Sequence, residues 1–145
     1  MKFIIYSAIP ESGVIRIPLM TECKCKIGIS SIIMPNISRQ RKNMRFSEVD
    51  IICDQVDSSL LNPKRMLQKI CINKNDNPYT TIAFQSVSFF PIDSSDHEFT
   101  IRIKDQYGPI VIPSKINGEL NGSLVTISLQ IRPIEIENDR WIKYI

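Results

Sequence analysis

The sequence has few residues of the kinds that carry catalysis or hold cofactors. It contains one histidine and five glycines in 145 residues. A single histidine leaves little scope for a Ser-His-Asp arrangement, and the glycines form neither a GxGxxG nor a GxxxxGK phosphate-binding pattern. The acidic residues do not follow the spacing of an EF-hand. We therefore expect a protein that is not an enzyme and that binds no cofactor or metal.

Long apolar runs are also missing. No run reaches the roughly 18 residues that a membrane-spanning helix needs, and the apolar stretch at residues 3–6 is too short for the core of a signal peptide. We expect no membrane span and a chain that starts in the cytosol. The cysteines are too few, and their surroundings too apolar, for a secreted disulfide framework, so we expect free buried thiols: Cys23, Cys25, Cys53 and Cys71.

What the sequence does contain is strand-forming residues, with isoleucine conspicuously common. The clearest pattern spans residues 98–132. Apolar and polar residues alternate strictly at 99–104 and again at 125–131, which predicts two half-buried strands. Gly108, Asn117-Gly118 and Asn121-Gly122 mark turns between them, because Gly and Asn accept the backbone conformations that tight turns require.

The rest of the chain predicts further strands with short connections. Residues 64–72 are ambiguous: Met66, Leu67 and Ile70 fit a helical turn, but the all-strand context favours a strand. About eight to nine strands suit an all-β, antiparallel β-sandwich of the jelly-roll type. We expect one such domain over residues 1–134, followed by a tail at 135–145. The other predicted strands are 2–6, 14–17, 22–34, 49–56 and one or two within 79–90.

The tail and one basic segment are the candidate contact regions. The tail carries Trp141 and Tyr144, which either fold back over their own sandwich or anchor a neighbouring subunit. The basic segment, residues 38–45, is either a solvated loop or a contact for nucleic acid phosphates or an acidic partner. Aromatic residues that could stack on bases do not interleave with its charges. Its candidate contact residues are Arg39, Arg41, Lys42 and Arg45.

Two other clusters have a chemical and a structural interpretation. His97 lies among Asp93, Asp96 and Glu98, which could form an acid/base or metal site but also suit a solvated turn before a strand. Cys23 and Cys25 could suggest a thiolate metal site. Residues two apart on a strand are about 6.6 to 7 Å apart, however, whereas two sulfurs on one zinc lie within about 4 Å. Core thiols are therefore the favoured interpretation.

Four segments, in the same order, resemble the small capsid-type protein of Polinton (Maverick) elements and adintovirus-like DNA viruses. That family carries an LP…WEVGLxEIxxP segment, a "VYCDIV" strand, an IxIxDxxG segment and a "VTLHFR" strand. The family's Trp is absent here, where Cys23 or Lys24 stands instead. The similar segments are 17–35 (IPLMTECKCKIGISSIIMP), 50–56 (DIICDQV), 101–108 (IRIKDQYG) and 125–132 (VTISLQIR).

The resemblance implies a structural virion component, a single jelly-roll capsid protein of the penton, vertex or minor type. It implies that the chain assembles with itself as a homopentamer, and with a major capsid protein, in the host cell. The residues themselves also allow a non-enzymatic binding module, lectin-like or adaptor, with ligand contacts in loops at one end. An enzyme centred on Asp93, Asp96, His97 and Glu98 is the third and least favoured alternative.

Overall fold

The computed structural model describes residues 2–8, 10, 13–18, 25–35, 46–73, 79–92, 98–105, 108–110, 115–116, 119–120 and 124–133. These residues form twelve strands. All assigned elements are strands, so the expected all-β fold is confirmed. Within the described part of the chain, no helix could cross a membrane.

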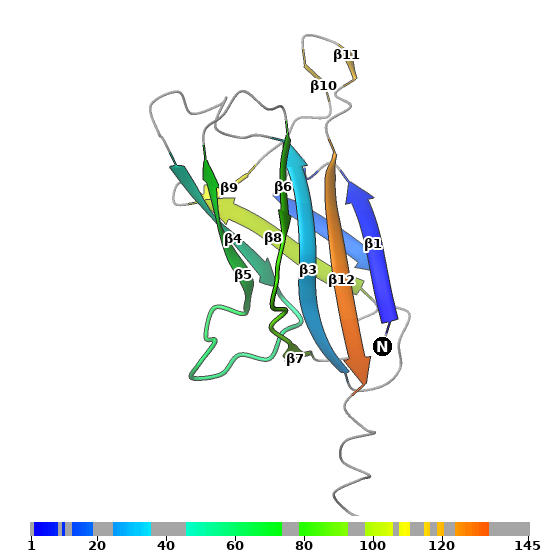
Figure 1. Ribbon diagram of the computed structural model, residues 1–145, viewed down its shortest axis with the longest axis vertical. Helices are drawn as coiled ribbons and strands as arrows, with labels where there is room; N and C mark the ends of the chain where they lie inside the picture. Colours follow the sequence, from blue (N-terminus) through cyan, green and yellow to red (C-terminus); the bar gives the residue numbers. More distant parts are fainter. Residues whose placement is uncertain are drawn as a thin grey trace, which may run out of the picture.

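Ten of these strands form two antiparallel sheets that lie face to face (Figure 1). The front sheet contains β1 (Lys2–Ala8), β12 (Val125–Pro133), β3 (Cys25–Pro35) and β6 (Tyr79–Ala83), in that order, with β7 (Phe90–Ile92) also on β3. The back sheet contains β2 (Val14–Pro18), β8 (Glu98–Asp105), β4 (Phe46–Cys53) and β5 (Met66–Asn73), with β9 (Gly108–Pro109) also on β8. The short strands β10 (Lys115–Ile116) and β11 (Glu119–Leu120) pair only with each other.

The order of the strands is that of a jelly roll. Counted along the chain, the eight strands on the two main paths read 1-8-3-6 in the front sheet and 2-7-4-5 in the back sheet. The first strand therefore pairs with the last, the second with the seventh, the third with the sixth and the fourth with the fifth. The chain is one long antiparallel hairpin rolled into two layers, which is the arrangement of two Greek keys.

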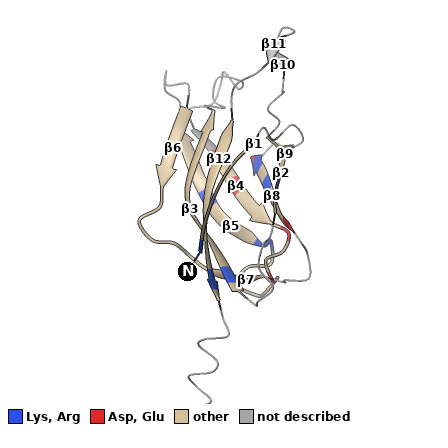
Figure 2. Ribbon diagram, turned by 90° about the vertical axis from the view of Figure 1, so that its right-hand side faces the viewer, with Lys and Arg blue, Asp and Glu red and all other residues tan. Residues whose placement is uncertain are grey.

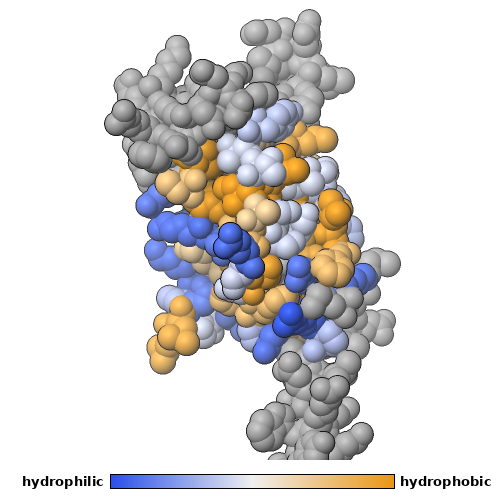
Figure 3. All heavy atoms as spheres, in the orientation of Figure 1, coloured by the Kyte–Doolittle hydropathy of each residue, from blue (hydrophilic) through white to orange (hydrophobic). Residues whose placement is uncertain are grey.

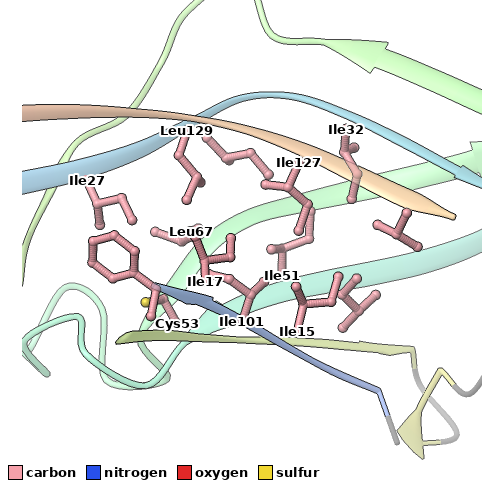
Figure 4. Close-up of a cluster of buried hydrophobic side chains, with 14 of the residues drawn as sticks. Ile15, Ile17, Ile27, Ile32, Ile51, Cys53, Leu67, Ile101, Ile127 and Leu129 are labelled. Atoms are coloured by element: carbon pink, nitrogen blue, oxygen red, sulfur yellow. The ribbon is translucent and has the colours of Figure 1, made fainter. Parts of the chain in front are cut away.

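The core between the sheets is built from alternating apolar residues, mostly isoleucine (Figure 4). Phe99, Ile101 and Ile103 of β8 point into it, while the residues between them are more exposed. β12 shows the same alternation over its whole buried length. The period-two patterns at 99–104 and 125–131 thus identified both the strands and their core faces correctly.

A β-bulge in β3 changes which residues face the core. Ser128 pairs with Ser31 and Leu129 with Ile29, so Ser30 is an additional residue in β3. The Ser30 hydroxyl donates a hydrogen bond to the Ser128 carbonyl at 3.1 Å, and the Phe84 amide donates to the Ser30 carbonyl at 2.9 Å. Because of this bulge, residues on both sides of it are buried although their spacing breaks strict alternation: Cys25, Ile27 and Ile29, then Ile32 and Met34.

A second bulge explains the ambiguous pattern at residues 64–72. Ile51 pairs with Gln68 and Ile52 with Met66, which leaves Leu67 as the additional residue in β5. Leu67 and Ile70 are both buried although they lie three residues apart, a spacing that resembles a helical turn. The strand interpretation is correct, and the bulge is the reason that the helical one looked plausible.

Candidate functional site

Most residues predicted to act as sites lie outside the described part of the chain. This holds for the basic segment with Arg39, Arg41, Lys42 and Arg45, and for the tail with Trp141 and Tyr144. It also holds for Asp93, Asp96 and His97, so all of these candidate sites stay predictions. Glu98, at the start of β8, is described: its carboxylate lies 4.0 Å from the Arg16 guanidinium in an exposed pair.

The cysteines divide between the core and the surface. Cys25 and Cys53 are buried, as expected for core thiols. Cys71 is free but exposed, which corrects the expectation that it is buried: its neighbours Ile70 and Ile72 face the core, so the residue between them faces outward. Cys23 lies outside the described residues. In the part of the chain that the structure describes, no group of three or more His, Cys, Asp or Glu side chains could hold a metal ion.

Burial controls the chemistry of Cys53. The pKa of its thiol rises from 9.0 to about 11, mainly because burial desolvates the thiolate; backbone hydrogen bonds oppose this rise, and the neighbouring Asp54 carboxylate adds a smaller part of it. The protonated thiol donates a hydrogen bond to the Gln55 side-chain oxygen at 3.6 Å. Since the thiolate is the nucleophilic and metal-binding form, this cysteine is inert near neutral pH.

A small polar cluster joins the end of β4 to β8. Gln55 is buried, and its side-chain oxygen accepts a hydrogen bond from the Thr100 amide at 2.6 Å, while its Nε2 lies 3.4 Å from the Thr100 hydroxyl. The Asp54 amide donates to the Thr100 carbonyl at 3.1 Å. Arg102, two residues further along β8, holds the Asp54 carboxylate through two nitrogens. These bonds join the end of β4 to β8, so the cluster stabilises the back sheet.

The loop that begins with Asp54 and Gln55 of this cluster, residues 54–65, presents two leucines to solvent. Leu60 and Leu61 are fully exposed, with relative exposures of 102% and 99%. The loop is held by its own hydrogen bonds: the Asn62 side chain accepts from the Met66 amide and donates to the Met66 carbonyl, both at 2.9 Å. The Ser58 hydroxyl also donates to the Pro63 carbonyl at 3.2 Å. A well-bonded loop thus exposes an apolar tip.

The outer face of the front sheet carries the second group of exposed apolar side chains. Phe3 and Ile5 of β1 are 64% and 73% exposed, and Ile33 of β3 is also exposed. Within β1, β12, β3 and β6 the charged residues are Lys2, Lys26 and Arg132. Lys2 pairs with Ile131 and Lys26 with Arg132, so all three lie at one end of the sheet, and Figure 2 shows blue segments at the lower end of these strands. Figure 3 shows orange and near-white residues over the upper part of this face and blue ones lower down. The outermost strand of this sheet is β1, and we call this strand, with its exposed Phe3 and Ile5, the β1 edge.

Sequence reasoning predicted a strand at residues 2–6 but missed that one of its faces is exposed and apolar. The available signal was that Phe3 and Ile5 alternate with Ile4 and Tyr6, so the strand is apolar on both faces. The exposed tip at Leu60 and Leu61 was not predicted either, because turn-forming residues surround it in the sequence. In both cases exposure depends on which other strands lie nearby, and the local sequence does not specify that.

Comparisons of this chain with protein-family models, with curated proteins and with solved structures found no match.

Proposed function

We propose that this chain is a structural virion component, a single jelly-roll capsid protein of the penton, vertex or minor type that assembles with copies of itself. The observation that carries the proposal is the strand order, 1-8-3-6 packed on 2-7-4-5. Viral capsid proteins are prominent among double-sheet jelly rolls, together with lectin domains and cupins. The ordered sequence segments that resemble Polinton and adintovirus-like capsid proteins favour the capsid among these.

The surface of the described residues supports a role in assembly. A protein that works through repeated contacts needs exposed apolar side chains on rigid elements, and the β1 edge and the tip of loop 54–65 supply them. The mechanism is geometric: a rigid sandwich offers the same surfaces to every neighbour, and symmetry repeats each weak contact many times. In this proposal the copies form homopentamers that join a major capsid protein in the virion.

The test is the mass of the purified protein by light scattering after size exclusion, with negative-stain images of the same peak. Pentamers, rings or shells are the expected result. A monomer that persists as the concentration is raised would overturn self-assembly.

A role for the basic segment in holding nucleic acid is part of the same proposal. Arg39, Arg41, Lys42 and Arg45 would contact phosphates by charge alone. Replacing all four by Ser should then reduce the nucleic acid content of assembled particles. Unchanged assembly and unchanged nucleic acid content would exclude the role.

A second candidate, a non-enzymatic binding module, is favoured by one observation. Loop 54–65 is fixed by hydrogen bonds and exposes Leu60 and Leu61 without burying any part of them, which suits an anchor that enters a partner's apolar pocket. Replacing both leucines by Ser should leave the melting temperature unchanged, because neither packs on the fold. If the double variant still assembles as the unmodified chain does, the tip is not a contact between copies, and a binding role for it must be tested with a partner protein.

A further inference from the structure

We infer that β1 pairs antiparallel with β1 of a second copy across a twofold axis, so that two front sheets become one continuous sheet. The inference rests on the proposed assembly function, and it names one of the contacts by which copies meet. Edge strands expose unpaired N–H and C=O groups and readily pair with another strand. In the described part of the chain, β1 pairs with β12 on one side only.

The four edges of the sandwich are not equally protected. Proteins protect edge strands by keeping them short, by placing Lys or Pro on them, or by inserting a bulge. β2 has five residues, including an exposed Arg16, and ends at Pro18. β5 contains the bulge at Leu67 and the exposed Lys69. β6 is protected by being short: it has five residues, and residues 84–89 separate it from β7.

β1 has none of these protections along most of its length. All of its seven residues pair with β12 without a register shift. Its one charged residue is Lys2, at its first position, and it contains neither Pro nor Gly. A long, regular, uncharged edge with exposed Phe3 and Ile5 is the kind that pairs with another chain.

The sequence of β1 is complementary to itself in this arrangement. The register that pairs all seven residues sets Ile5 opposite Ile5 of the second copy, and sets Phe3 opposite Ser7 and Ile4 opposite Tyr6. Residues directly opposite one another share a face, so the exposed set Phe3, Ile5 and Ser7 stays on one face and the core-facing set on the other. Lys2 lies opposite Ala8, so the two lysines are at opposite ends and do not repel each other.

The two front sheets also match in charge. The outer faces meet at their uncharged part, because Lys26 and Arg132 lie at one end of the sheet, on strands inside the edge. A twofold contact joins two copies only, so it is separate from the contacts that would close a pentamer.

The test is site-directed disulfide cross-linking of the full chain. Cys23→Ser and Cys71→Ser remove one native cysteine outside the described residues and the exposed one, and Ile5→Cys is added to this background. Across the twofold axis, two residues directly opposite have Cα atoms about 4.5–5.5 Å apart, within the range a disulfide spans. Mild oxidation with diamide should therefore give a covalent dimer in non-reducing electrophoresis.

The matched control is Ser7→Cys in the same background. Ser7 is exposed on the same strand and face, but in the proposed register it lies four residues from its own copy, about 13 Å along the strand. It should form far less dimer. Equal cross-linking at both positions would show random collision and overturn the contact. No dimer from either variant would overturn the contact as well.

The outcome is separable from that of the proposed function. A cross-linked dimer from a protein that never forms rings or shells would support the β1 contact and overturn the capsid proposal. Ile5→Lys places two like charges opposite each other in the proposed register. If Ile5→Lys assembled into shells as readily as the unmodified chain, the β1 contact would be overturned and the capsid proposal would stand.

Discussion

Two guanidinium nitrogens of Arg102 on β8 donate hydrogen bonds of 2.9 to 3.0 Å to the carboxylate of Asp54, which directly follows β4. The hydrogen bond and the charge of Asp54 raise the pKa of Arg102 above its already high ordinary value. Both side chains are partly solvent-exposed, so water and salt screen the attraction. The pair nevertheless fixes the start of loop 54–65 against the back sheet, because its geometry is bidentate.

Replacing Arg102 by Gln should lower the free energy of unfolding by about 0.5 kcal/mol, the range of well-formed exposed ion pairs. Urea denaturation at low and high salt measures it, and the loss should shrink as salt is added. Arg16→Gln is the matched control, because Arg16 lies 4.0 Å from Glu98 and its side chain is 71% exposed. An equal loss in both variants would show that the pair of Arg102 and Asp54 stabilises the fold no more than the longer pair of Arg16 and Glu98.

Replacing Gln55 by Ala should cost more, about 1–3 kcal/mol, because it leaves the Thr100 amide without its short hydrogen bond in a partly buried site. Chemical denaturation measures this loss as well. Gln85 is exposed, so Gln85→Ala should change stability by less than about 0.5 kcal/mol. A Gln55→Ala variant as stable as Gln85→Ala would contradict a structural role for the cluster.

The pKa of Cys53 predicts a loss of stability at alkaline pH. The folded thiol ionises at about 11 and the unfolded thiol near 9.0. Between these values the unfolded state loses a proton that the folded state keeps, so stability is intact below pH 9 and falls as pH rises toward 11. The shift of two units corresponds to at most about 2–3 kcal/mol. Unfolding from pH 8 to 11 should show a steeper fall in the unmodified chain than in Cys53→Ala, and parallel curves would refute the prediction.

Gly28 should tolerate no side chain. A Cβ at this position would lie 2.5 Å from Val87 Cγ1 and 2.8 Å from the Ser88 carbonyl oxygen, which belongs to the backbone. Gly28→Ala should therefore displace residues 87–89 and cost about 1–3 kcal/mol. Ser31→Ala, on the same strand, adds no atom and should cost less than about 0.5 kcal/mol. Thermal unfolding of the two variants compares them directly. Similar melting temperatures would mean that residues 87–89 move aside without a loss of stability.

Part of the fold was predictable because part of it is local. Alternation over residues 99–104 and 125–131 specified strands and their buried faces, since successive side chains on a strand point to opposite sides. The positions of the bulges at Ser30 and Leu67 were not predictable. A bulge is a relation between two paired strands, and it shifts the alternation that the prediction depends on.

The candidate sites were less predictable than the fold. Charge runs and aromatic residues drew attention to residues 38–45 and to Trp141, which lie outside the described residues. The Gln55 cluster escaped prediction because it joins residues 45 positions apart. The β1 edge escaped it because an apolar strand looks the same in the sequence whether its second face is covered or open.

The sequence by itself determined that this protein is a strand-rich sandwich with an isoleucine core, because period-two patterns and turn residues act over a few positions. Only the tertiary structure decided which strands are neighbours. The pairing of the first strand with the last joins residues more than a hundred positions apart, and it leaves the other side of β1 open in the described structure. An edge exists only once all the strands have taken their places, so the surface on which the proposed contact depends is a property of the assembled sheets.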